Sequence, residues 1–139
     1  MNTFSAQILT PEGSVFDDEV VGVRVPGEMG SFEVKTLHAN IISSLEIGKI
    51  LVRKAAGGEQ HFAVTGGFVE VVDNKLTLLA EAAEPIGEID IERAKQAKKR
   101  AEERLSSDDK SIDEERAKKA LRRAENRIKL SANFEVSTQ

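Results

Sequence analysis

Apolar and polar residues alternate with a period of two along the first half of the chain, a pattern typical of strands with one buried face. Strict alternation occurs in residues 4–8 and 21–25, and the apolar-rich runs 49–54, 61–72 and 76–80 are also predicted as strands. Gly, Pro, Asn and Asp separate them, as at Thr10-Pro11-Glu12-Gly13 and Asp73-Asn74. Short strands at this spacing predict an antiparallel β-sandwich or barrel. Gly66-Gly67 interrupts one run, which indicates a bulge or a close backbone approach.

The period changes to three and four in the second half, where the sequence nearly repeats itself. Residues 89–105 and 112–128 both begin with Ile-Asp and then place Glu, Arg, Ala and Lys at matching positions. The polar residues 106–110 lie between the two copies, so we predict an antiparallel helical hairpin. Asp90 is the expected N-cap of the first helix. Ser111 with Glu114 forms a capping-box pattern for the second.

Proline and glycine near residue 85 end the strand pattern, so we predict two domains. Residues 1–84 form the β-sandwich and residues 85–139 the two-helix hairpin, a β + α two-domain fold class. The formal net charge of −4 is divided unevenly. The first domain carries 6 Lys and Arg against 12 Asp and Glu, and the second 14 against 12, giving −6 and +2. The hairpin is therefore suited to an acidic partner.

Small apolar residues form one stripe on each predicted helix. The two stripes are Ala94, Ala97, Ala101 and Leu105, and Ala117, Ala120, Leu121, Ala124 and Ile128. Alanines let helices approach closely but bury little apolar surface, about 0.8 kcal/mol for each methyl group. Such a hairpin is marginal by itself. Two interpretations follow: a mobile element that a ligand or partner controls, or a hairpin docked permanently on the sandwich.

Arginines form a second stripe on each predicted helix: Arg93, Arg100 and Arg104 on the first, Arg116, Arg123 and Arg127 on the second. Guanidinium groups converging from two helices can bind phosphate groups. The alternative is a solvated face on which Glu102, Glu103 and Glu125 are the ionic partners.

Several functional classes are disfavoured by the composition. The chain has no cysteine, tryptophan or tyrosine, which argues against disulfides and against a base-stacking nucleic-acid surface. No run of apolar residues is long enough to span a membrane, and the start does not read as a signal peptide. His38 and His61 are the only histidines, and neither has metal-ligand spacing around it. We therefore expect no metal site, no catalytic residues and no enzyme activity of its own.

Taken in order, these motifs resemble the epsilon subunits of bacterial F-type ATP synthases over almost the whole chain. The most specific stretches are Ala63-Val64-Thr65-Gly66-Gly67-Phe68-Val69-Glu70-Val71, residues 74–84 and the repeated Ile-Asp-x-x-Arg-Ala. The resemblance implies a non-catalytic rotor subunit of the central stalk that couples ion-driven rotation to ATP synthesis. Its implied location is the cytoplasmic face of the plasma membrane, peripheral and without membrane insertion.

The resemblance also implies partners for each domain. The sandwich would bind the gamma subunit and the c-ring. The hairpin would either fold on the sandwich or extend toward the alpha and beta subunits, where it would inhibit ATP hydrolysis. The loop at residues 34–41 lacks the two prolines usual in the family. The candidates for the c-ring contact are Glu28, Met29, Gly30, Phe32 and His38.

No cofactor is required in this interpretation, but some members of the family bind ATP as a regulatory ligand in the folded hairpin. The matching residues are Glu84, Ile89, Asp90, Arg93, Ala94, Arg123 and Arg127. An alternative function is a free-standing ATP-sensing module whose hairpin closes on the nucleotide. Binding to a gamma subunit distinguishes the two.

Overall fold

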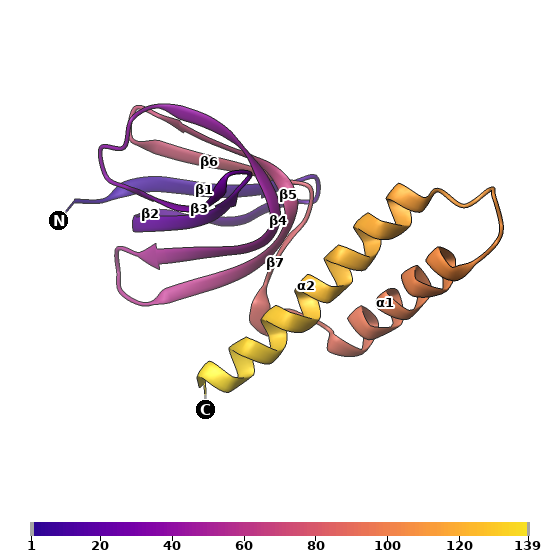
Figure 1. Cartoon of the computed structure of the whole chain (residues 1–139). Helices are drawn as coiled ribbons and strands as arrows, with labels where there is room; N and C mark the ends of the chain where they lie inside the picture. Colours follow the sequence, from indigo (N-terminus) through magenta and orange to yellow (C-terminus); the bar gives the residue numbers. More distant parts are fainter. Residues whose placement is uncertain (1, 139) are drawn as a thin grey trace. The chain divides into compact units, whose positions relative to one another are not determined.

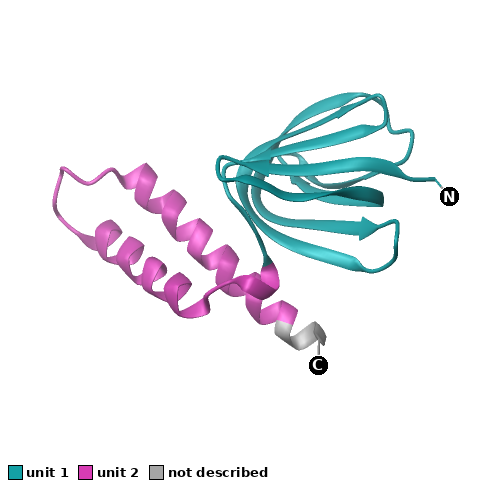
Figure 2. Cartoon of the chain, turned by 180° about the vertical axis from the view of Figure 1, so that it is seen from behind, with its two compact units in different colours: residues 1–85 teal, residues 86–139 magenta. Residues whose placement is uncertain are grey.

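A computed structural model describes residues 2–138 and divides the chain into two compact units (Figure 1). Unit 1 comprises residues 1–85 and contains the strands; unit 2 comprises residues 86–139 and contains the helices (Figure 2). The predicted order, a β domain followed by two helices, is confirmed.

Unit 1 is a β-sandwich built from one continuous, bent sheet. Its strands are β1 (Phe4–Thr10), β2 (Gly13–Gly27), β3 (Gly30–Lys35), β4 (Ile41–Lys54), β5 (Glu59–Val72), β6 (Lys75–Ala80) and β7 (Ala83–Pro85). The order is β1-β6-β5-β4-β2-β3, β7 pairs with β5, and a β1–β2 pairing closes the sheet on itself. All pairings are antiparallel except that of β1 with β6, which is parallel and was not predicted.

The inward residues of these strands form one apolar core in which most side chains are fully buried. In β2, however, the buried valines are Val20, Val23 and Val25, while Val21 is only half-buried. The pairing of β2 with β4 shifts between Val20 and Gly22, so an irregularity changes the phase of the alternation. The alternation predicted for residues 21–25, with Val21, Val23 and Val25 on one face, is therefore wrong at Val21.

Gly66 and Gly67 permit a close backbone approach, as predicted. Both have positive φ, +119° and +136°. A Cβ on Gly67 would lie 2.0 Å from the backbone oxygen of Leu79 on β6. The glycines stand where β5 stops pairing with β7, at Val64, and starts pairing with β6, at Gly67.

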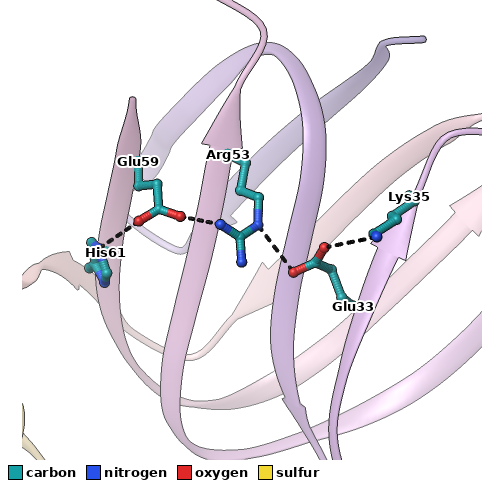
Figure 3. A network of polar contacts seen from close by, with 5 residues as sticks. All are labelled: Glu33, Lys35, Arg53, Glu59 and His61. Carbon is teal, nitrogen blue, oxygen red and sulfur yellow. Dashed lines mark hydrogen bonds and ion pairs between the residues drawn. The ribbon is translucent and has the colours of Figure 1, made fainter. Parts of the chain in front are cut away.

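Charged side chains from three strands form a ladder across the outside of unit 1 (Figure 3). Arg53 on β4 pairs with Glu33 on β3, at 3.3 Å, and with Glu59 on β5. Glu59 also approaches His61 at 4.0 Å, and Lys35 approaches Glu33 at 4.0 Å. Gly22 of β2 leaves room for the first pair, since a Cβ there would lie 3.2 Å from Glu33 Oε2.

Unit 2 consists of a short 3-10 helix η1 (Ile86–Glu88) and two antiparallel helices, α1 (Ile91–Ser106) and α2 (Glu114–Thr138). Asp90 is the N-cap of α1, where its carboxylate accepts a hydrogen bond from Arg93 N at 3.1 Å, as predicted. Asp113 caps α2 in the same way through Arg116 N. The predicted capping box is therefore wrong: Ser111 bonds instead to Asp109, within the loop.

Only four residues of the predicted alanine stripes are fully buried. They are Ala94 and Ala101 on α1 and Ala117 and Ala124 on α2, each at most 2% exposed. Both pairs are seven residues apart, and the remaining members of the stripes are half-buried. We call these four residues the alanine seam. Four buried methyl groups contribute on the order of 3 kcal/mol, a small apolar contribution for a pair of helices.

The His61 ring gives unit 1 a pH-dependent stability. Burial and the nearby Lys49 lower its pKa from the ordinary 6.5, with Glu59 opposing and Arg53 adding to the shift. Around and below that value the unfolded chain binds more protons than the folded one, so stability falls as the pH falls. As the pH falls from about 8 to about 5, we expect the free energy of unfolding to decrease less in His61→Gln than in the parent chain. Urea unfolding followed by circular dichroism measures this, and equal losses in the two chains would contradict it.

Candidate functional site

The predicted phosphate-binding residues of unit 2 gather at one end of the hairpin. Ala94 and Ala124 belong to the part of the alanine seam farther from the connecting loop, because Ala101 and Ala117 lie next to that loop. Asp90 is the N-cap of α1 and Arg93 lies in its first turn, while Arg123 and Arg127 flank Ala124 on α2. The antiparallel arrangement thus brings residues that are 30 to 37 positions apart in sequence to the same end of the unit.

Each of these residues has a different environment. Ile89 and Ala94 are 8% and 0% exposed, so their side chains serve packing and hold the two helices in place. Asp90 is exposed and caps α1, while Arg93 is exposed and extends from the first turn. The Asp90 carboxylate already occupies the N-terminus of α1, so the positive charge offered to an anion here comes from Arg93.

Arg123 and Arg127 differ from the other predicted arginines. Arg93, Arg100, Arg104 and Arg116 are exposed, as expected for a solvated face. Arg123 and Arg127 are half-buried, and the Nε atom of Arg123 is fully buried. They are one turn apart on the same face of α2, a spacing at which two side chains can reach one ligand. Burial thus distinguishes Arg123 and Arg127 from the four exposed arginines.

The seventh candidate, Glu84, belongs to unit 1. It is half-buried in β7, where it pairs with Ala63 of β5. Unit 1 also has a shallow cleft of about 290 Å³ lined by residues 10–15 and 81–83. None of the predicted site residues lines this cleft.

The candidates for a c-ring contact do not form one surface. Glu28 and Met29 form the tight turn between β2 and β3, followed by Gly30 with φ +116°. Met29 is 100% exposed, and Phe32 is half-buried against Gly27. His38 lies beyond the other end of β3, where its Nδ1 is 2.8 Å from Ala39 O. Six residues of strand at about 3.3 Å each separate the two ends.

An apolar surface on the outside of unit 1 was not predicted from the sequence. Ile42, Phe68 and Leu79 are 73%, 55% and 51% exposed. Phe68 of β5 pairs with Leu79 of β6 on one side and with Ser44 of β4 on the other. We call Ile42, Phe68 and Leu79 the outer apolar face. The sequence contained a signal for this exposed surface. Successive side chains of a strand point to opposite faces, so two consecutive apolar residues such as Leu78-Leu79 must place one on each face.

The loop that contains His38 adjoins this face. Leu37 is 82% exposed and has φ +58°. Its N–H donates to Asn74 Oδ1 at 2.7 Å, and Asp73 N donates to Asn40 Oδ1 at 3.0 Å. These side-chain bonds fasten the loop to the β5–β6 turn, immediately before Ile42. His38 therefore belongs with the outer apolar face rather than with Met29.

Both halves of the chain match one protein family. Residues 3–86 match the family domain described as "ATP synthase, Delta/Epsilon chain, beta-sandwich domain", and residues 88–132 match its "long alpha-helix domain". The chain belongs to the ATP synthase delta/epsilon family. The predicted resemblance is thereby confirmed.

The curated relatives include ATP synthase epsilon chains from several bacteria. The one from Protochlamydia amoebophila is 47% identical over 109 residues, covering 78% of this chain and 74% of the relative. The one from Salinibacter ruber is 46% identical over 109 residues, covering 73% of each.

Two solved structures share the fold. A chain of the Euglena gracilis mitochondrial ATP synthase, solved with its c-ring, has a TM-score of 0.78 at 19% identity and covers 100% of this chain and 83% of its own length. A chain of the central stalk and c-ring of the Tetrahymena thermophila enzyme has a TM-score of 0.53 at 17% identity, with 94% coverage of both chains.

No group of residues suited to a metal ion exists within the described part of the chain. Neither helix of residues 2–138 has the length and apolar character needed to cross a bilayer.

Proposed function

We propose that this chain is a non-catalytic rotor subunit of the ATP synthase central stalk, with a C-terminal hairpin that restrains ATP hydrolysis. The observation that carries the proposal is the contrast between the two units. Unit 1 has a continuous apolar core and a closed sheet. Unit 2 is held by the alanine seam, whose apolar contribution is small. A stable body joined to a weakly closed hairpin is the construction expected of a structural subunit that also regulates.

Unit 1 attaches the chain to the rotor through two surfaces. The outer apolar face, with the adjacent loop that carries Leu37 and His38, binds the gamma subunit. Exposed apolar side chains grouped on a sheet are typical of a protein interface. The turn at Glu28, Met29 and Gly30, supported by Phe32, contacts the c-ring. As a subunit of the assembled enzyme, the chain lies at the cytoplasmic face of the plasma membrane.

Unit 2 regulates by exchanging partners. Residues 85–139 carry a net charge of +2, and Arg93, Arg100, Arg104 and Arg116 are exposed. An extended hairpin can therefore bind acidic segments of the alpha and beta subunits. Because the alanine seam is weak, a modest difference in partner affinity is sufficient to shift the population between closed and extended hairpins.

ATP favours the closed hairpin in this proposal. The half-buried Arg123 and Arg127 bind the phosphates, and the exposed guanidinium group of Arg93 adds positive charge. Asp90 offers a carboxylate acceptor, while Ile89 and Ala94 position the helices. A ligand at one hundred times its dissociation constant stabilises the bound form by about 2.7 kcal/mol, comparable with the whole alanine seam.

Phe68→Glu tests attachment to gamma. A carboxylate in the middle of the outer apolar face should weaken binding of the gamma subunit by about tenfold or more. Met29→Glu is the matched control, since it places the same charge on an exposed apolar residue outside the outer apolar face. We expect it to leave gamma binding intact and to weaken association with the c-ring. Co-purification of tagged chains measures both. Failure of the parent chain to bind gamma would favour the free-standing ATP-sensing module.

Deletion of residues 86–139 tests the inhibitory role. Unit 1 has its own core, so the shortened chain should still assemble with the enzyme. We expect ATP hydrolysis by the assembled enzyme to rise, because the basic hairpin is no longer available to the alpha and beta subunits. Steady-state hydrolysis, compared at equal content of assembled enzyme, provides the measurement. Unchanged hydrolysis would show that the hairpin is not an inhibitor.

Arg123→Ala combined with Arg127→Ala tests nucleotide binding. We expect the double variant to lose ATP-induced compaction of the isolated full chain, because the phosphates lose both buried guanidinium groups. Arg100→Ala with Arg104→Ala is the matched control, since it removes two exposed arginines with the same spacing on α1. Small-angle X-ray scattering with and without ATP measures compaction. An unchanged response of the first variant would exclude this pocket.

A further inference from the structure

The last part of α2 continues past the start of α1 and packs on η1. Helix α2 has 25 residues and α1 has 16, so the longer helix has a segment that α1 cannot cover. Ser131 is nevertheless only 6% exposed. It follows Ala117 and Ala124 at the same seven-residue spacing, which extends the line of small residues. On the other side of the hairpin, Ala101, Ala94 and Gly87 of η1 are likewise seven residues apart.

Phe134 makes the contact that closes this end of unit 2. Its ring lies over Gly87: a Cβ built on that glycine would be 3.4 Å from Cε1 and 3.8 Å from Cζ. The φ angle of Gly87 is not positive, so the backbone itself does not require glycine there. The missing side chain instead lets the ring approach the 3-10 helix. On either side of Gly87 and Glu88, Ile86 and Ile89 are 3% and 8% exposed.

The packed turn leads directly into the first turn of α1. Ile89 N donates to Ile86 O at 3.2 Å, which closes η1. Asp90 follows and caps α1. Its carboxylate accepts a hydrogen bond from Arg93 N at 3.1 Å, and its backbone oxygen accepts one from Ala94 N at 3.1 Å. Any contact that holds η1 in place therefore also fixes the direction in which α1 begins.

Helix α2 presents this contact and the two half-buried arginines on one face. Arg123, Arg127, Ser131 and Phe134 follow one another at spacings of four, four and three residues, which is a single stripe of an α-helix. A rigid helix that loses its contact with η1 thus also moves its arginines relative to Asp90 and Arg93.

We propose that Ser131 and Phe134 of α2 form a latch on η1 that holds the start of α1 in its nucleotide-binding position. This regulation deepens the proposed function and rests on it for the role of the nucleotide. The latch closes the end of the hairpin that the alanine seam does not reach. When it opens, the N-cap of α1 loses its support and the affinity for nucleotide falls in proportion to the closed fraction.

Hydrogen exchange on the full chain without nucleotide tests the latch. The reporters are the amides of Ile89, Arg93 and Ala94. They donate to Ile86 O, to the Asp90 carboxylate and to Asp90 O, respectively. We expect Phe134→Ala to accelerate exchange at all three by about tenfold or more, because removal of the ring favours local opening. The amide of Ala117, bonded to Asp113 O at 3.1 Å near the other end of the hairpin, is the internal reference and should change little.

Two control variants define the contact. Asn133→Ala alters the exposed neighbour of Phe134 and should leave the three amides unchanged. Gly87→Ala adds a methyl group at ordinary contact distance from the ring and should not accelerate exchange. Unchanged exchange at the three amides in Phe134→Ala would overturn the latch. Equal acceleration at Ala117 would also overturn it, because the ring would then support the whole hairpin rather than one end.

A titration with ATP forms the second part of the test. In Phe134→Ala we expect the apparent dissociation constant for ATP to rise in proportion to the loss of the closed fraction. A parent chain that does not bind ATP would refute the nucleotide role, while the exchange experiment would still decide on the latch. Normal ATP affinity together with fast exchange at the three amides would overturn the coupling between latch and nucleotide.

Discussion

The close approach of alanines between α1 and α2 is the interaction on which the behaviour of this chain depends. Alanine side chains let two helices pack with little separation, yet each contributes only one methyl group to the buried surface. With Ala94, Ala101, Ala117 and Ala124 as its fully buried residues, the seam specifies the geometry of the hairpin more strongly than it stabilises it. The stability of the hairpin must therefore come also from additional contacts, and in the proposed function these are the contacts that are regulated.

Unit 1 has the opposite character. Its strands close into a continuous sheet around a core of Val, Ile, Leu and Phe side chains. The glycines at 66 and 67 let β5 change partners with backbone atoms in close contact, and a ladder of charges ties three strands together on the outside. A body of this kind is suited to keep partner surfaces in place while, in the proposed function, unit 2 opens or closes. The surfaces proposed for gamma and the c-ring are set apart by the length of β3.

The same face of α2 serves both the proposed ligand and the proposed latch. Arg123 and Arg127 are half-buried, and Ser131 and Phe134 extend their stripe to η1. Because one rigid helix carries all four residues, phosphate binding and contact with η1 favour the same position of α2. Two weak contributions that agree in this way can stabilise a closed hairpin that neither would hold alone, which is the energetic basis expected of a regulated element.

The sequence by itself determined the local elements and the family. Alternating and apolar-rich runs bounded by turn residues predicted most strands, and the repeated copies predicted two helices with Asp90 as a cap, because these signals depend on neighbouring residues. Only the tertiary structure decided the features that depend on distant residues. A pairing irregularity buried Val20 in place of Val21, β3 separated His38 from Met29, and antiparallel packing half-buried Arg123 and Arg127 among the six arginines. Strand register and helix packing join residues far apart along the chain, and neither follows from local periodicity.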